Sequence, residues 1–151
     1  MFSIVKQPGF QARSDVLENE VQRLNVSLPK ASLAVVATPL LGTWVNCDPQ
    51  TRGLVRLLIT TAGNEVIAHG FGAGSPTPCD WGPVNGLIYA DNVTAKPALA
   101  FSAVNTFHFK QTTIVGHLLN GTLIVETFDH FTDKSGRADY YSMYSMNILA
   151  Q

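Results

Sequence analysis

The sequence predicts an all-β protein, an eight-stranded antiparallel up-and-down barrel with a short N-terminal helical arm. Three observations lead to this prediction. Helical periodicity ends near residue 40, the β-favouring residues Thr, Val, Ile, Phe and Tyr dominate after it, and turn sequences separate the apolar runs at short intervals. Closing eight such strands into a barrel leaves no sticky sheet edge, and a barrel of this size can hold one small ligand.

The predicted domains are an N-terminal arm over residues 1–40 and a barrel over residues 41–151. In the arm, Ser14 or Asp15 can cap a short helix, with Glu18 at capping-box distance. The apolar stripe of this helix suits three roles: an arm packed on the barrel, a lid over a barrel mouth, or an oligomerisation helix.

Eight strands are expected over residues 41–47, 53–62, 65–72, 84–91, 98–109, 111–119, 122–131 and 138–149. The dipeptide Asn120-Gly121 is the strongest hairpin signal in the chain. A two-residue turn there places His117 opposite Ile124. One connection, residues 72–83, is long and rich in Gly and Pro, which is typical of binding or gating loops.

The composition excludes some partners and favours others. The net charge is −1, so nucleic acid is not an expected partner, and no basic run suits a membrane surface. Hydrophobic residues make up 46% and charged residues 14%, and both faces of the predicted hairpins are apolar, so we expect a homo-oligomer, a dimer or a tetramer. No signal peptide is evident, which predicts a cytoplasmic protein with Cys47 and Cys79 as thiols, although one disulfide is geometrically possible.

The stretch GTWVN at residues 42–46 resembles the first strand of the avidin and streptavidin family, where Trp and Asn project into the ligand cavity. The segments ALAFSAVNTF, TTIVGHL and VETFDHFTD are similar to later strands of that family in order and spacing, and the similarity covers residues 41–148. Gly-x-Trp starts also occur in lipocalin-type barrels. The blocks TWVNCDPQTRG and PTPCDWG resemble small uncharacterised bacterial β-barrel proteins.

The avidin-like resemblance implies an internal ligand cavity. The ligand-binding residues it implies are Trp44, Asn46, Leu57, Gly70, Phe101, Asn105, Phe107, Ile114, Thr127, Ser142 and Tyr144. The chain departs from the family at Asn105, Ile114 and Asp129, where biotin binders carry further Trp residues. Val55 and Gly70 stand where Ser and Tyr flank the biotin carbonyl. We therefore expect a small, largely apolar ligand other than biotin.

Asp129 and Tyr140 are the candidate catalytic residues. An inward-facing Asp is costly unless it is paired or protonated, so Asp129 could bind a ligand, act as a general base, or lie solvated at the barrel mouth. Trp81 could fold over the cavity as a ligand-binding lid, or pack on the outer wall. His117 and Glu126 could form a pair, or make separate outward contacts.

Three functions stay open at this point: a small-molecule binding barrel, a cofactor-free cyclase or isomerase of secondary metabolism, and an oligomeric structural domain without a ligand. The sequence shows no metal-ligand spacing and no cofactor motif, so no metal and no cofactor are expected. Small inward residues predict empty space inside the barrel rather than a filled core; they are Gly70, Gly72, Ala103 and Gly116.

Overall fold

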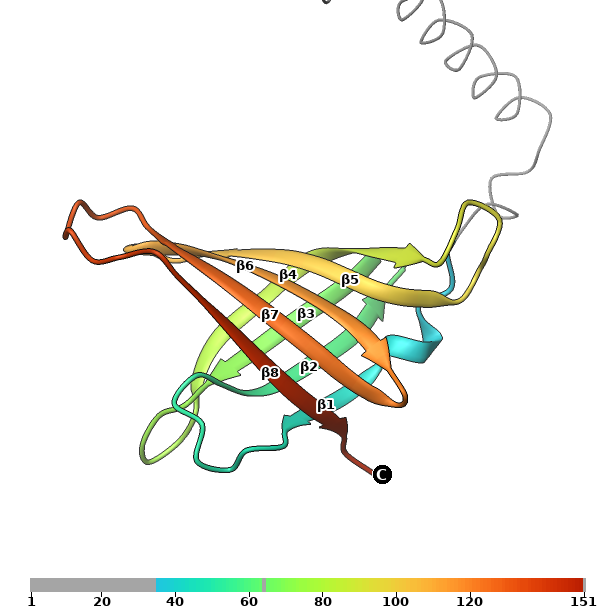
Figure 1. Ribbon diagram of the computed structural model, residues 1–151, viewed down its shortest axis with the longest axis horizontal. Coiled ribbons are helices and arrows are strands. Elements are labelled where there is room, and N and C mark those ends of the chain that lie inside the picture. The colour runs from blue at the N-terminus through green and yellow to red at the C-terminus, as the bar shows by residue number, and fades with distance from the viewer. Residues whose placement is uncertain (1–34, 64, 151) are drawn as a thin grey trace, which may run out of the picture. The chain divides into compact units, whose positions relative to one another are not determined.

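The computed structural model describes residues 35–63 and 65–150, and these form a closed barrel of eight antiparallel strands (Figure 1). A 3₁₀ turn, η3 (Thr38–Leu40), precedes the barrel. The strands are β1 (Gly42–Asn46), β2 (Leu54–Ala62), β3 (Glu65–Gly72), β4 (Cys79–Ala90), β5 (Ala98–Thr106), β6 (Lys110–Leu119), β7 (Thr122–Phe131) and β8 (Tyr140–Ile148). Each strand pairs with the next, and β8 pairs with β1. The predicted barrel and its strand order are confirmed, whereas the predicted N-terminal helix lies outside the described residues.

The β6–β7 hairpin has the predicted register. Asn120 and Gly121 have φ angles of 51° and 81°, as a two-residue turn with left-handed central residues requires. His117 therefore pairs with Ile124. Because side chains alternate along a strand, this register fixes which residues of both strands face the interior.

Strand β4 begins at Cys79, five residues before its predicted start. Gly82 and Pro83 suggested a break, because Pro cannot donate a ladder hydrogen bond. In the structure, a bulge in the β3–β4 pairing accommodates this stretch, and the strand continues on both sides of it. The predicted long loop is therefore reduced to residues 73–78, and Trp81 lies on a strand.

The chain before β1 closes one end of the barrel, here called the closed end. The backbone of Val36 bonds to Lys96 and Ala98 beside the start of β5. Leu40 has no exposed surface, and the indole N–H of Trp44 donates to its carbonyl over 2.9 Å. Figure 1 shows η3 at the same end as the β6–β7 hairpin, with the β7–β8 connection at the opposite, open end.

The middle of the barrel is filled. Its largest fully buried apolar side chains are Leu54, Leu57, Ile59, Phe101, Ile114, Leu123, Val125 and Met146. A Cβ added at Gly116 would overlap the Phe101 ring, and one added at Gly70 or Gly72 would lie 2.7 Å from the Trp81 ring. The prediction of empty space at these glycines is wrong, because aromatic rings from neighbouring strands occupy it.

The outer surface of β7 and β8 carries a cluster of apolar side chains. Phe128, Tyr141 and Met143 point outward and are 44%, 50% and 62% exposed. Glu126 lies among them and accepts a hydrogen bond from the Tyr141 hydroxyl over 2.6 Å, rather than pairing with His117. Phe128, Tyr141, Met143 and Glu126 are together called the outer apolar face.

The Tyr141–Glu126 bond predicts a measurable titration. The Glu126 carboxylate stabilises the protonated phenol and raises the pKa of Tyr141 above its usual 10.0. The contribution of this hydrogen bond to the stability of the fold is present at neutral pH. It is lost as the pH rises through the pKa of Tyr141. Glu126→Gln is expected to lower that pKa towards 10, measured from tyrosinate absorbance, with Tyr141→Phe identifying the transition. Coincident curves for the parent and Glu126→Gln would contradict this expectation.

Candidate functional site

The open end of the barrel holds a pocket of about 200 Å³. It is lined by Arg52, Gly53, Gly72, Ala73, Cys79, Trp81, Lys110, Thr127, Asp129, Tyr140 and Tyr144. These residues come from the β1–β2 and β3–β4 connections and from β3, β4 and β6 to β8. The pocket therefore combines a charged pair with three aromatic side chains, which is the mixture that ligand sites use for orientation and contact area.

A buried ion pair forms the polar centre of this pocket. The Lys110 ammonium lies 2.9 Å from Asp129 Oδ1, and the Thr112 hydroxyl donates a hydrogen bond to the same oxygen. The side chain of Asp129 is 5% exposed and that of Lys110 is 16% exposed. A carboxylate at this depth needs such partners, because burial without them is costly. The structure thus places Asp129 inside the mouth rather than in solvent.

Aromatic rings surround the Lys110 ammonium. It lies 5.7, 5.8 and 5.9 Å from the ring centroids of Phe107, Phe109 and Tyr140, within the range of cation–π attraction. Together with Asp129, these rings restrict the lysine side chain to the pocket and leave its remaining N–H donors available there.

Trp81 lies on the inner face of the barrel and forms one wall of the pocket. Its ring covers Gly70 and Gly72, and it meets Phe107 edge-on at a centroid distance of 5.9 Å. Its backbone carbonyl accepts a hydrogen bond from the Asn105 amide over 3.2 Å. The alternative in which Trp81 packs on the outer wall is therefore wrong, and its close fit depends on glycine at both β3 positions.

Asn105 has a buried oxygen that lacks a partner among the described residues. Its side chain is 2% exposed, its amide nitrogen is bonded to Trp81, and no donor of residues 35–63 or 65–150 reaches Oδ1. Asn105 pairs with Thr112, which pairs with Asp129, so the three face the interior side by side. A buried acceptor of this kind calls for a donor from water or a ligand.

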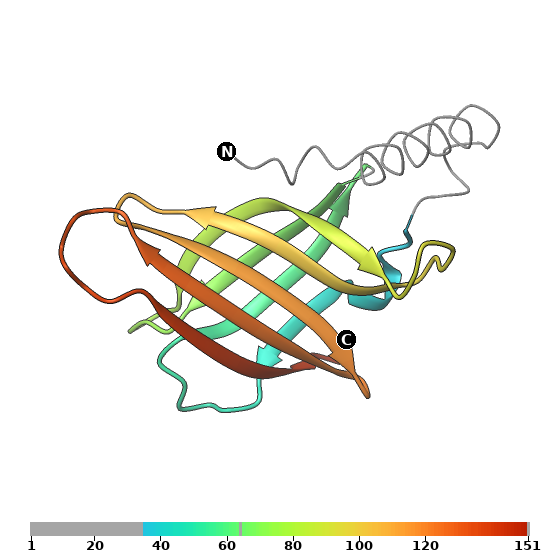
Figure 2. The same ribbon diagram turned by 45° about the horizontal axis from the view of Figure 1, so that its top comes forward.

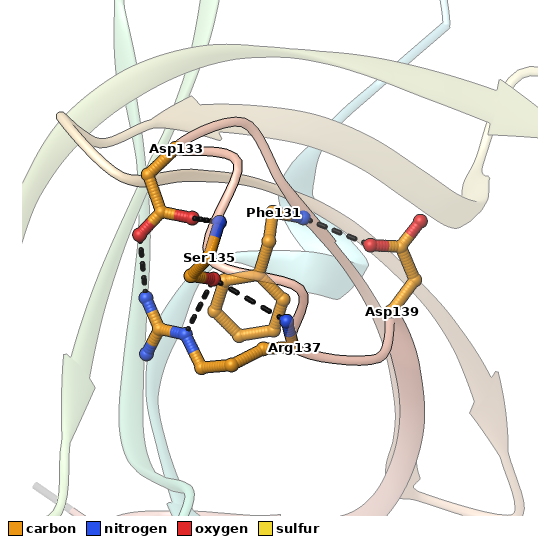
Figure 3. A network of polar contacts seen from close by, with 5 residues as sticks. All are labelled: Phe131, Asp133, Ser135, Arg137 and Asp139. Carbon is orange, nitrogen blue, oxygen red and sulfur yellow. Dashed lines mark hydrogen bonds and ion pairs between the residues drawn. The ribbon is translucent and has the colours of Figure 1, made fainter.

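The β7–β8 connection forms part of the rim and is held by its own polar contacts (Figure 3). The Arg137 guanidinium donates to Asp133 over 2.8 Å and stacks 4.2 Å above the Phe131 ring. Hydrogen bonds from Ser135 and Arg137 lower the pKa of Asp133, so this carboxylate stays ionised at neutral pH. The Phe131 N–H donates to Asp139 over 2.9 Å, next to the start of β8. These contacts hold the chain just before Tyr140, which lines the pocket. Figure 2 shows the β7–β8 connection projecting from the open end.

The predicted site residues fall into four places. Five line the pocket: Trp81, Thr127, Asp129, Tyr140 and Tyr144. Four lie in the filled core: Trp44, Leu57, Phe101 and Ile114. Three pack around Trp81: Gly70, Asn105 and Phe107. Asn46 and Ser142 line an adjacent groove of about 550 Å³ between the β1–β2 connection and β8, which shares Arg52 and Tyr144 with the pocket.

Lys110 and Arg52 are the charged pocket residues that the sequence analysis missed. Lys110 stands two positions before Thr112 on the same strand face, so strand alternation could have placed it inside. Arg52 lies in the β1–β2 connection, and no periodic signal points to it.

Other chemistry is limited in the described part of the chain. Residues 35–63 and 65–150 contain no group of three or more His, Cys, Asp or Glu side chains that could hold a metal ion. Cys47 and Cys79 are exposed free thiols, so the disulfide alternative is not realised. None of the helices in this part is long and apolar enough to cross a membrane.

The fold and the site define a class: a closed eight-stranded antiparallel barrel with a charged and aromatic pocket at its open end. A comparison of the chain with protein-family models, curated proteins and solved structures finds no match. The resemblance to the avidin and streptavidin family therefore stays a prediction. The geometry of the pocket is the basis for a proposed function.

Proposed function

We propose that the protein binds a small molecule in the pocket at the open end of the barrel. The observation that carries this proposal is a polar group in and beside the pocket: Lys110 and Asp129 are held within a mostly apolar barrel, and next to Trp81 the buried Asn105 Oδ1 has no donor among the described residues. Burying charged and polar groups costs stability, and a purely structural barrel would gain by replacing them with apolar side chains. Retaining them at an accessible mouth fits ligand recognition.

The lining favours a more polar ligand than the sequence predicts. A largely apolar ligand would cover the Lys110–Asp129 pair without offering it hydrogen bonds in place of those from water. Apolar contact area comes from Trp81, Tyr140 and Tyr144. A molecule with an aromatic or conjugated body and polar groups matches both parts of the wall.

Native mass spectrometry of the protein purified from its own host tests this proposal. We expect a bound small molecule that survives the native measurement and is released on denaturation. Ala73→Trp, which places a large side chain at the pocket rim, is expected to reduce its occupancy at least tenfold. Val93→Trp is the matched control, because Val93 is 96% exposed in the β4–β5 connection at the closed end. A bound molecule retained equally by both variants would contradict the open-end site.

A cofactor-free cyclase or isomerase is the second candidate, and one observation favours it. Asp129 Oδ2 receives no hydrogen bond from the described residues, and Asp129 pairs across the strands with Tyr140 at the same pocket. A carboxylate and a phenol side by side can move a proton within a bound substrate. If the molecule released from the protein differs from the molecule supplied, and Asp129→Asn stops that conversion, the barrel is an enzyme.

We also propose that two copies of the chain meet through the outer apolar face. Three exposed large apolar side chains, Phe128, Tyr141 and Met143, lie together there, whereas exposed apolar patches on monomers are usually small. Glu126, the carboxylate of this face, is already bonded to the Tyr141 phenol, and the exposed His130 and Asp139 side chains that contact each other lie at its edge.

Light scattering after gel filtration tests this contact. A dimer of 16.3 kDa chains is expected, and Met143→Lys should shift the mass to that of one chain. Val93→Lys, at an exposed position far from the face, should leave the dimer intact. A single-chain mass for the parent protein would contradict the proposed contact, and a dimer that persists in Met143→Lys would place it elsewhere.

A further inference from the structure

The size and walls of the open-end pocket limit the shape of its ligand. The pocket volume of about 200 Å³ lies below the roughly 300–1,000 Å³ of pockets that hold drug-sized ligands. Trp81, Tyr140 and Tyr144 present three aromatic side chains to this small space. A single planar ring fits such a space and can stack on or meet these rings edge-on.

The charges of the lining favour an anionic group on that ring. Arg52 and Lys110 are two cations, and Asp129 is the one carboxylate among the lining residues. The Lys110 ammonium has three donors and bonds to a single carboxylate oxygen of Asp129, so further donors face the pocket. A ligand carboxylate can accept them in charge-assisted bonds and balance the excess positive charge.

One carboxylate oxygen of the pocket is free to accept a hydrogen bond from the ligand. No hydrogen bond from the described residues reaches Oδ2 of Asp129, a residue of the pocket lining, whereas the unpartnered Asn105 Oδ1 is buried outside that lining. Both residues face the interior, one on each side of Thr112 in the strand pairing. A ligand carboxylate alone has no donor for Asp129 Oδ2, whereas a hydroxyl or amine on the ring can donate to it.

We propose that the ligand of the open-end pocket is a small aromatic acid that also carries a hydroxyl or amine donor. This inference rests on the proposed binding function and names the chemical class of its ligand. Lys110 and Arg52 hold the carboxylate, the aromatic wall holds the ring, and the free oxygen of Asp129 accepts from the donor.

The test uses 4-hydroxybenzoate as the probe, with benzoate and phenol as probes that each lack one group. Binding is followed by the indole N–H resonance of Trp81 in the ¹⁵N-labelled full chain, with Trp44, buried in the core, as the internal reference. We expect 4-hydroxybenzoate to bind at least tenfold more tightly than either benzoate or phenol, and to shift the Trp81 resonance alone. Equal affinities for the three probes would overturn the inference.

Two arginine variants provide the matched control. Arg52→Met should weaken 4-hydroxybenzoate and benzoate severalfold and leave phenol unchanged, because phenol has no carboxylate. Arg56→Met should change none of the three affinities, since Arg56 lies over the Phe71 ring on the outside of the barrel. An identical effect of both variants would overturn the role of Arg52.

The failure of this inference can be told apart from failure of the binding function. If the molecule recovered by native mass spectrometry occupies the pocket but lacks either the carboxylate or the donor, the ligand class is wrong and the binding function stands. If no molecule is recovered and none of the three probes binds, both are wrong.

Discussion

Lys110→Met is expected to lower the free energy of unfolding by about 3 kcal/mol, the low end of what breaking a buried ion pair costs. Asp129 is 5% exposed in the parent protein. In the variant its carboxylate keeps the Thr112 hydroxyl as its remaining partner. The low end applies because the lysine side chain itself is 16% exposed and so is partly solvated. Urea denaturation of both proteins measures the difference.

Two further variants make this prediction specific to the pair. Lys110→Met/Asp129→Asn should recover most of the loss, because a neutral amide can keep a bond with Thr112 and carries no charge to desolvate. Lys96→Met removes an exposed lysine of the β4–β5 connection and should change the unfolding free energy by less than about 0.5 kcal/mol. If Lys110→Met changed the unfolding free energy as little as Lys96→Met does, solvent would screen the Lys110–Asp129 pair. That result would contradict a buried ion pair at the centre of the pocket.

Gly116→Ala is expected to destabilise the protein by about 2 kcal/mol, within the range for overpacking a filled core. The added Cβ would overlap Phe101 Cε1 and lie 3.1 and 3.2 Å from two further ring atoms. Phe101 is 1% exposed, so its ring has no free space to enter.

A double variant tests whether the ring causes this loss. Phe101→Leu shortens the side chain that Gly116 accommodates, so Gly116→Ala should cost at least about 1 kcal/mol less in the Phe101→Leu background. Thermal or urea unfolding of the four proteins gives the coupling. Additive effects would mean that the ring does not fill the space at Gly116, and that the interior is looser than the structure shows.

Local sequence signals were sufficient to predict the strand order and the hairpin register. The Asn120-Gly121 turn needs residues that accept positive φ, and once it is placed, alternation divides the side chains of β6 and β7 between two faces. Alternation grouped Asp129 with Thr112, Ile114 and Thr127 on one face, and the avidin-like resemblance assigned that face to the interior, where the structure has it. The start of β4 was missed because Pro83 is usually a strand breaker, and a bulge that tolerates it depends on the partner strand.

The filling of the interior could not be predicted from alternation. A glycine on an inner face shows only that no side chain starts there. At Gly70 and Gly116 the space belongs to Trp81 and Phe101, which reach across from other strands. The avidin-like resemblance likewise implied that Trp44 faces a ligand cavity, whereas its indole bonds to Leu40 in the segment that closes the other end of the barrel. Which space stays open depends on packing in three dimensions.

A crystal structure of the protein purified from its own host, without added ligands, tests the central claim most directly. The proposed function predicts a bound molecule at the open end, in contact with Trp81 and with Lys110. A bound molecule in the groove between the β1–β2 connection and β8, with only water beside Lys110 and Asp129, would contradict it.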